Sequence, residues 1–316
     1  MTHSTASRTA RIFLLLTVFT WAQIAFGALV RAKQAGLSCP DWPLCHGALV
    51  PNLKLTGVVY EYGHRVFAAI VSALYVLGAV VGWRAPELRR FRGLFVGLGA
   101  LLLVQAVFGG LTVLLVDKSD GAARPATWTV VSHLLLGNTF GALALLTALR
   151  LREIDVPEPA PLRPPPPLTR ALAGLWMACL VLQMVIGGSI AGSLQGLACA
   201  EFPTCNGGLW FPTLDGYTGV QILHRCNACL LVAVGWTLSW LLRHRGRLGL
   251  VANGLAWLIL AQVGLGAMNV WSQLKPHVTT AHSLVAALLF STTAVLAMEL
   301  RRQPSATPAP LEREGH

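Results

Sequence analysis

Charged residues are scarce in this sequence, which has 316 residues of which 12% are charged and 54% are hydrophobic. A soluble globular domain carries about a quarter of its residues as charged side chains, because its surface must be solvated by water. The composition therefore excludes an ordinary soluble enzyme or binding domain. It indicates a chain that is largely embedded in a membrane.

Several motifs of chemistry-bearing proteins are also absent. The sequence has no P-loop, no dinucleotide-binding fingerprint and no nucleophile motif. Covalent haem attachment needs Cys-x-x-Cys-His, but "CPDWPLCH" has five residues between its cysteines, and Cys226 and Cys229 are followed by Leu230. We interpret these two cysteines and Cys179 as small apolar residues of membrane helices.

The sequence does contain eight long apolar runs. A membrane core of about 30 Å is crossed by roughly 20 helical residues. The runs that meet this length lie near 12–30, 61–83, 93–116, 127–149, 170–192, 218–242, 248–271 and 278–299. No small-residue cleavage site closes the first run, so we expect it to be a helix and not a signal peptide. The predicted fold is an all-α membrane protein with eight transmembrane helices.

The positive charges are unevenly distributed between the predicted loops. Of the 24 Lys and Arg residues, most lie at the N-terminus, at the C-terminus and in the loops that lead from an even-numbered helix to the next odd-numbered one. Cytoplasmic loops keep positive charge, so both termini are predicted to be cytoplasmic and the cysteine-containing loops to lie outside. The net charge of +11 is explained by this rule and does not predict nucleic-acid binding.

A proline-rich segment, "VPEPAPLRPPPPL" at 156–168, divides the chain into two similar halves. Shifting one half by 160 residues aligns the following pairs: Gln23/Gln183, Gly27/Gly187, Gly36/Gly196, Cys39/Cys199, Pro43/Pro203, Cys45/Cys205, Gly47/Gly207, His64/His224 and Arg65/Arg225. We predict two tandem pseudo-symmetric four-helix bundles related by an axis along the membrane normal. Their bounds are 1–155 and 170–302, with a cytoplasmic linker at 156–169 and a disordered tail at 303–316.

A shorter pattern, Gln-x-x-x-Gly, occurs on all four odd-numbered helices. Its members are Gln23/Gly27, Gln105/Gly109, Gln183/Gly187 and Gln262/Gly266. A spacing of four places both residues on one helical face. The pattern is compatible with small-residue helix packing supported by a polar hydrogen bond, and equally with glycines that make room for a flat, bulky group.

Four histidines lie inside the even-numbered helices, near their outer ends: His64, His133, His224 and His282. A single intramembrane histidine is often a packing residue or part of a proton path. Two facing imidazoles in one bundle can instead supply both axial ligands of a haem iron. Zinc fits less well, because it normally takes three or four protein ligands. Two bundles thus predict two haem sites.

Each half also has a loop with two cysteines six positions apart, Cys39/Cys45 and Cys199/Cys205. On the outer side of a membrane such pairs can close as disulfides. For Cys199/Cys205 we favour a structural disulfide, and for Cys39/Cys45 a structural and a redox role remain open. Each loop precedes a histidine-bearing helix and is expected to form a lid over a haem pocket.

The segments "GALVRAKQAGLSCPDWPLCHG" and "EYGHR", together with their echo in the second half, resemble the haem A synthase family of the cysteine-containing bacterial type. The resemblance covers nearly the whole chain. It implies a bacterial plasma-membrane oxidoreductase that converts a methyl group of haem O to the formyl group of haem A. Haem O synthase and terminal oxidase assembly are the implied partners, with an electron acceptor or donor and a possible homo-oligomer.

The resemblance also implies roles for individual residues. His64 and His133 are expected to hold the substrate haem in the N-terminal half, and His224 and His282 to hold haem b in the C-terminal half. Cys39 and Cys45 are candidate catalytic residues. Arg65 and Arg225, one position after each ligand, are expected to pair with haem propionates, unless they only extend to the membrane interface.

The two halves differ at Glu61, which aligns with Gln221. A carboxylate near a membrane helix end is costly unless it is used or paired, and pairing with Arg65 would suffice to keep it. An amide cannot accept a proton, so the halves are chemically unequal. This favours a reactive N-terminal site with Glu61 as base or cation stabiliser. Alternatives are a dihaem cytochrome b that only transfers electrons and a haem carrier.

Overall fold

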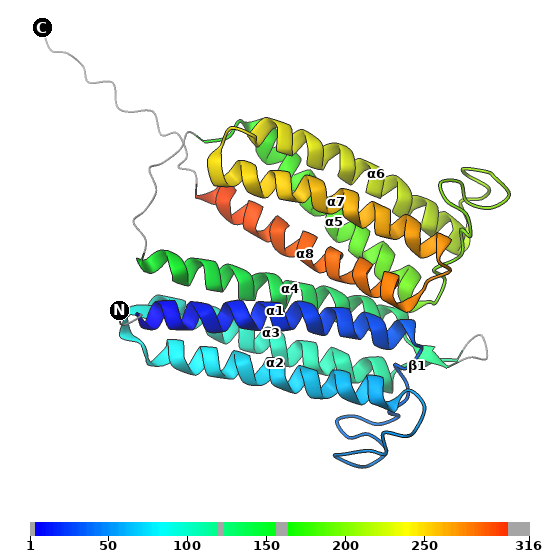
Figure 1. Cartoon of the computed structure of the whole chain (residues 1–316), viewed down its shortest axis with the longest axis horizontal. Coiled ribbons are helices and arrows are strands. Elements are labelled where there is room, and N and C mark those ends of the chain that lie inside the picture. The colour runs from blue at the N-terminus through cyan, green and yellow to red at the C-terminus, as the bar shows by residue number, and fades with distance from the viewer. Residues whose placement is uncertain (1–3, 119–122, 156–163, 303–316) are drawn as a thin grey trace, which may run out of the picture.

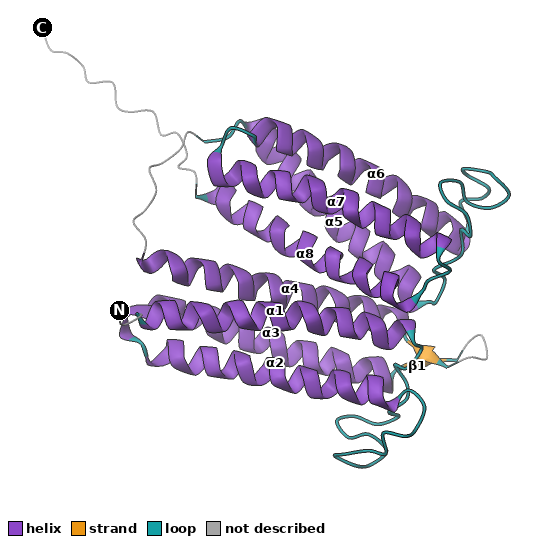
Figure 2. Ribbon diagram, in the orientation of Figure 1, coloured by secondary structure: helices purple, strands orange, loops and turns teal. Residues whose placement is uncertain are grey.

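The protein is all-α, with eight long helices (Figures 1 and 2). The computed structural model describes residues 4–118, 123–155 and 164–302. Most of the predicted linker and the predicted tail at 303–316 lie outside these residues. The helices are α1 (Thr5–Ala32), α2 (Val58–Arg84), α3 (Arg92–Leu114), α4 (Thr127–Arg152), α5 (Pro167–Gly192), α6 (Gly216–Leu242), α7 (Gly246–Trp271) and α8 (Pro276–Arg301).

All eight helices are long and apolar enough to cross a membrane, which confirms the predicted fold class. Helix α1 starts seven residues before its apolar run, because Ser4 caps it by accepting a hydrogen bond from the Ser7 amide. Only α3 ends before its predicted limit. Beyond it, β1 (Val116–Asp117) pairs with β2 (Arg124–Pro125) in a short hairpin that the apolar run did not reveal.

Two short 3-10 helices continue the chain at one end of the molecule, η1 (Pro86–Phe91) and η2 (Glu153–Asp155). We call this end, where α1, α3, α5 and α7 begin, the arginine face. The opposite end carries both disulfide loops and is called the cysteine face. Figure 1 shows the loops of 33–57 and 193–215 together at this end of the helices.

The helix contacts are compatible with two tandem four-helix bundles. In the N-terminal half α1 packs against α2 and α4, and α3 packs against α4. In the C-terminal half α6 lies between α5 and α7, and α7 also packs against α8. The halves meet where α1 and α4 contact α8 and where α4 contacts α5. Helix α4 is consequently the most buried of the eight.

The tightly packed core of each half lies toward the arginine face. In the N-terminal half it contains Phe13, Leu88, Phe95 and Leu98, and in the C-terminal half Trp176, Leu238, Leu255 and Ile259, all nearly inaccessible. The histidines lie on the other side of this packing, toward the cysteine face. The fold therefore separates a dense structural layer from a layer that carries the candidate ligands.

Polar contacts join the two halves at both levels. The Trp21 indole on α1 donates to Ser291 Oγ on α8 at 3.0 Å. At the arginine face Glu153, just after α4, pairs with Arg302 and with Arg247, which lies 3.3 Å away. These contacts link α1 to α8, and the end of α4 to the start of α7 and the end of α8.

Packing of the C-terminal core depends on a glycine in α6. A methyl group at Gly235 would lie 2.6 Å from Trp176 Cζ3, and the Trp176 indole is already fixed by donating to Thr293 Oγ1 at 2.9 Å. We expect Gly235→Ala to destabilise the protein by about 1–3 kcal/mol through overpacking. Thermal unfolding in detergent measures this. Gly97→Ala is the control, because nothing lies near that position on α3; equal unfolding of the two variants would contradict the prediction.

Candidate functional site

Both predicted disulfides are present. The Cys39 and Cys45 sulfurs are 2.01 Å apart, and those of Cys199 and Cys205 are 1.96 Å apart. All four cysteines are buried beneath their loops. Of the remaining cysteines, Cys179 is buried within α5 while the other two are exposed on α6.

The two cysteine loops are built by equivalent hydrogen bonds although their sequences differ. Asp41 accepts bonds from the amides of His46 and Gly47, at 2.6 and 2.8 Å. Glu201, which is 160 residues further on, accepts bonds from Gly207 and Gly208. These acidic residues went unnoticed in the sequence, although the 160-residue offset pairs them.

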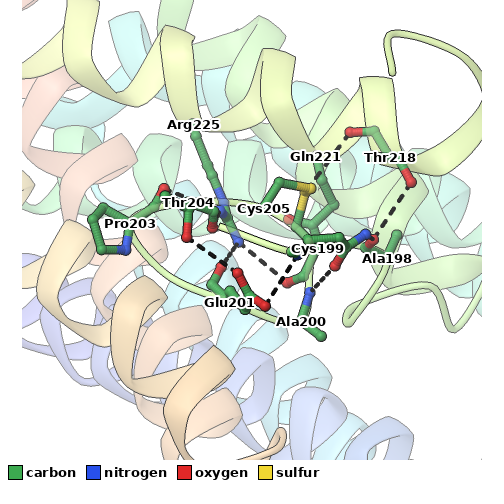
Figure 3. Close-up of a disulfide and its surroundings, with 12 residues drawn as sticks. Ala198, Cys199, Ala200, Glu201, Pro203, Thr204, Cys205, Thr218, Gln221 and Arg225 are labelled. Atoms are coloured by element: carbon green, nitrogen blue, oxygen red, sulfur yellow. Dashed lines mark hydrogen bonds between the residues drawn. A yellow bond between two sulfur atoms is a disulfide. The ribbon is translucent and has the colours of Figure 1, made fainter. Parts of the chain in front are cut away.

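In each half one arginine, next to the histidine of α2 or α6, holds the cysteine loop above that helix. Arg65 donates to the carbonyl oxygens of Cys39, Asp41 and Leu44. Figure 3 shows the same arrangement in the second half, where Arg225 donates to the Cys199, Glu201, Pro203 and Thr204 carbonyls. Each guanidinium thus fastens a disulfide loop to its helix, and the expected pairing with propionates stays a prediction.

Glu61 lies in the first turn of α2 and contacts the cysteine loop. Its side chain is 6% exposed, with Oε1 2.7 Å from Arg65 Nη2 and Oε2 accepting a 2.8 Å hydrogen bond from the Cys39 amide. Gln221 occupies the same place in the second half but donates its amide to the Gly196 carbonyl at 2.7 Å. The first loop is therefore tied to a buried carboxylate, and the second to a neutral donor.

Each histidine is seated by the Gln-x-x-x-Gly pattern of the neighbouring odd-numbered helix. The glutamine amide nitrogen lies 3.2–3.4 Å from the histidine Nε2 in the pairs Gln23/His64, Gln105/His133, Gln183/His224 and Gln262/His282. A methyl group on the matching glycine would lie 2.9–3.5 Å from the same ring, at Gly27, Gly109, Gly187 and Gly266. The glycines thus make room for the imidazoles, and the glutamines give them a polar neighbour.

One further difference between the halves was missed in the sequence. Asn227 donates to Gln183 Oε1 at 2.7 Å and to the Cys179 carbonyl at 2.9 Å. Phe67 stands at the equivalent position, and the Gln23 Oε1 atom is buried without a hydrogen-bond partner. The glutamine of the second half is therefore locked in place, whereas that of the first is fixed only through its amide nitrogen.

The residues present fit haem iron better than a metal site made by protein alone. Each half has two imidazoles seated in the same way, His64 with His133 and His224 with His282. Among the described residues no three His, Cys, Asp or Glu side chains gather as a metal site. The Nδ1 atoms of His64, His224 and His282 are buried without partners. Paired imidazoles with no further protein ligand match axial ligation of haem.

The hydrogen bonds of Asp41 and Glu201 predict that the stability of the two cysteine loops depends on pH. The Gly47 and His46 amides lower the pKa of the Asp41 carboxyl below its ordinary value of about 3.9, and the Gly208 amide leads the same effect on Glu201. A lowered carboxyl pKa means stabilisation that is complete above the ordinary pKa and lost as pH falls through the folded value. We expect each disulfide to become easier to reduce on acidification.

A phosphine reductant followed by peptide mass spectrometry can read each disulfide separately. Asp41→Asn is expected to accelerate reduction of Cys39–Cys45 at neutral pH and to flatten its pH profile, while Cys199–Cys205 is unchanged. Glu201→Gln is the matched control. It should accelerate reduction of Cys199–Cys205 and leave Cys39–Cys45 unchanged. A Cys39–Cys45 profile that is unaltered by Asp41→Asn would refute the role of this carboxylate.

Comparison with known proteins gives concordant matches over most of the chain. The model of the COX15-CtaA family, described as cytochrome oxidase assembly protein, matches residues 10–56 and 52–294. Two proteins named "Heme A synthase", from Halalkalibacterium halodurans and Symbiobacterium thermophilum, are 28% and 30% identical in sequence to this chain. The first alignment covers 93% of this chain and 98% of the relative, and the second 78% and 80%. The chain belongs to the COX15-CtaA family of cytochrome oxidase assembly proteins.

Proposed function

We propose that this protein is a haem A synthase, which oxidises a methyl group of haem O to the formyl group of haem A. The names of its relatives support this activity. The observation that carries this proposal is a difference between the two halves. They seat their histidines alike, but the first half has Glu61 where the second has Gln221. One bundle has a carboxylate one helical turn before its ligand, and the other has an amide at that position.

The C-terminal half is proposed to hold a resident haem b between His224 and His282. When bound, this haem supplies electron transfer. Asn227 supports the assignment, because it completes the hydrogen bonding of Gln183 and so stiffens the seat of His224. A permanently bound group gains from such preorganisation.

The N-terminal half is proposed to hold the substrate haem between His64 and His133. Glu61 lies one helical turn before His64, and its negative charge would stabilise positive charge that develops on the methyl carbon during oxidation. The same carboxylate would accept a proton from the water that adds to this carbon. Each round also removes two electrons and one proton from this carbon, and the electrons pass to an electron acceptor that the proposed function requires. Two rounds, each adding one water oxygen, give a hydrated aldehyde that loses water.

Arg65 forms an ion pair with the buried Glu61 side chain and also holds the loop of Cys39 and Cys45. Because the Cys39 amide donates to Glu61, a change in this loop would be felt directly at the carboxylate. A redox role for the Cys39–Cys45 disulfide is therefore proposed here beside its structural one. Arg65 and Arg225 are also proposed to meet haem propionates at the loop edge.

The positive-inside distribution supports an orientation with the arginine face in the cytoplasm and the cysteine face outside a bacterial plasma membrane. Disulfides form on that side. The proposed partners are a haem O synthase, which supplies the substrate, and a terminal oxidase in assembly, which receives the product.

The haem b assignment is tested at its ligands. His224→Met or His282→Met is expected to change the low-spin haem b spectrum of the purified protein, because one axial imidazole is replaced by a thioether. Binding of added haem O in the N-terminal half should persist. His277→Met, an exposed position on the same helix as His282, is the control. An unchanged haem b spectrum in both ligand variants would refute this assignment.

The proposed role of Glu61 is tested by making the first half resemble the second. Glu61→Gln is expected to retain haem binding but to slow conversion by about 10²-fold or more, with haem O or a hydroxymethyl product accumulating. Extraction and chromatography of the pigments from cells that carry only this variant measure the outcome.

Gln221→Glu is the matched control and should not create a second reactive site. Haem A at wild-type amounts in Glu61→Gln would exclude a chemical role for Glu61. Loss of all haem would instead make the residue structural.

A further inference from the structure

The two bundles are closed at different edges. In the N-terminal half α1 packs closely against α4, while α2 and α3 barely touch. In the C-terminal half the reverse holds, because α6 packs closely against α7 while α5 and α8 barely touch. Each bundle thus has one weakly joined pair of helices, α2/α3 in the first and α5/α8 in the second. These two pairs are not equivalent in the repeat, which relates α2/α3 to α6/α7.

The weak edge of the C-terminal half is covered by the other half. Helix α4 contacts both α5 and α8. A methyl group at Gly188 of α5 would lie 3.3 Å from Val131 Cγ2, and one at Gly192 would lie 3.2 Å from Thr127 Cγ2, both on α4. The glycines of α5 therefore allow α4 to pack closely against it. As a result, α4 covers the edge between α5 and α8 in the haem b half.

The weak edge of the N-terminal half, which we call the α2/α3 seam, has no such cover from the described helices. In the most apolar stretches of α2 and α3, 17% of the residues are buried. In the equivalent helices α6 and α7 the value is 33%. This edge lies away from the contacts with α5 and α8, so it faces the lipid of a membrane.

The α2/α3 seam is joined near the arginine face and weakly joined beyond it. The Tyr75 hydroxyl donates to the Phe95 carbonyl at 2.6 Å, and a methyl group at Gly99 would lie 2.5 Å from that hydroxyl. At the other end Trp42, from the cysteine loop, covers Gly110 of α3, whose added methyl would lie 2.9 Å from the ring. The stretch of α3 from Gln105 to Gly109, which seats His133, lies between these two closures and directly adjoins the second one.

One alanine on each helix lies in the stretch between the closures. Ala68 lies seven residues from Tyr75 on α2, and Ala106 lies seven residues from Gly99 on α3, both toward the cysteine face. Two turns of helix return a side chain to nearly the same direction. Ala68 and Ala106 are therefore placed at one level on the two sides of the α2/α3 seam.

We propose that the α2/α3 seam is a lateral portal through which the substrate haem enters the N-terminal site from the lipid and the product returns to it. The proposal rests on the proposed function. A substrate site must exchange an apolar, flat molecule at every turnover, whereas a resident haem stays in place. The uncovered edge belongs to the half with Glu61, and the walled edge to the half with Asn227.

Cross-linking across the α2/α3 seam tests the portal. Ala68→Cys and Ala106→Cys are combined in a background where the exposed Cys226 and Cys229 are changed to serine, and the pair is joined with a bis-maleimide. The protein is placed in lipid nanodiscs and haem O is added to the lipid. The measurements are haem O uptake from the visible spectrum and haem b content.

Cross-linking before haem O is added is expected to slow uptake at least tenfold and to leave haem b unchanged. Cross-linking after loading should still allow conversion but retain the product in the protein. Protein with either cysteine alone, alkylated by a monofunctional maleimide, should take up haem O normally. The matched pair Ala228→Cys and Val263→Cys, equivalent positions on α6 and α7, should have no effect when joined.

Uptake at the normal rate in the cross-linked protein would overturn the portal. Equal slowing by the α6/α7 pair would overturn it as well, because the effect would then be general stiffening. Uptake without oxidation in protein that was never cross-linked would count against the proposed function alone. Failure of that protein to bind haem O at all would overturn both proposals.

Discussion

A histidine buried in a membrane helix needs both space and a polar neighbour, and this need governs the architecture of the protein. A helix packed tightly on all sides has no room for an imidazole that points inward. Here the adjacent helix supplies a glycine to clear the ring and a glutamine to face its nitrogen, as at Gly187 and Gln183 beside His224. Because each odd helix serves the next even one, the helices act as four pairs.

The pairs can carry ligands only because stability comes from elsewhere. The inaccessible side chains Phe13, Phe95, Trp176 and Leu238 lie toward the arginine face, where dense packing holds the helices together. The part of each bundle toward the cysteine face, which carries the histidines, contributes less to this packing. It is closed by a disulfide loop, which an arginine fastens through backbone carbonyls at Arg65 and Arg225.

Much of this could be predicted from the sequence. Apolar length located all eight helices, the 160-residue repeat located both disulfides, and charge differences marked Glu61. The weak points have physical causes. Hydropathy cannot detect the hairpin that ends α3, because Val116 is as apolar as the helix before it. The hydrogen bonds of Asp41 and the contact of Asn227 with Gln183 depend on how loops and side chains turn, which periodicity does not specify.

Which edges are closed was also hidden from the sequence, since duplication predicts equal bundles. Helix α4 breaks the equality, because it carries His133 and also fills the edge between α5 and α8. The C-terminal bundle therefore borrows one of its walls from the other repeat. Produced without the first four helices, it would present the small residues Gly188 and Gly192 to lipid in place of a packed neighbour. The C-terminal half has thereby come to depend on the first, so it cannot be treated as a self-sufficient copy of the ancestral bundle.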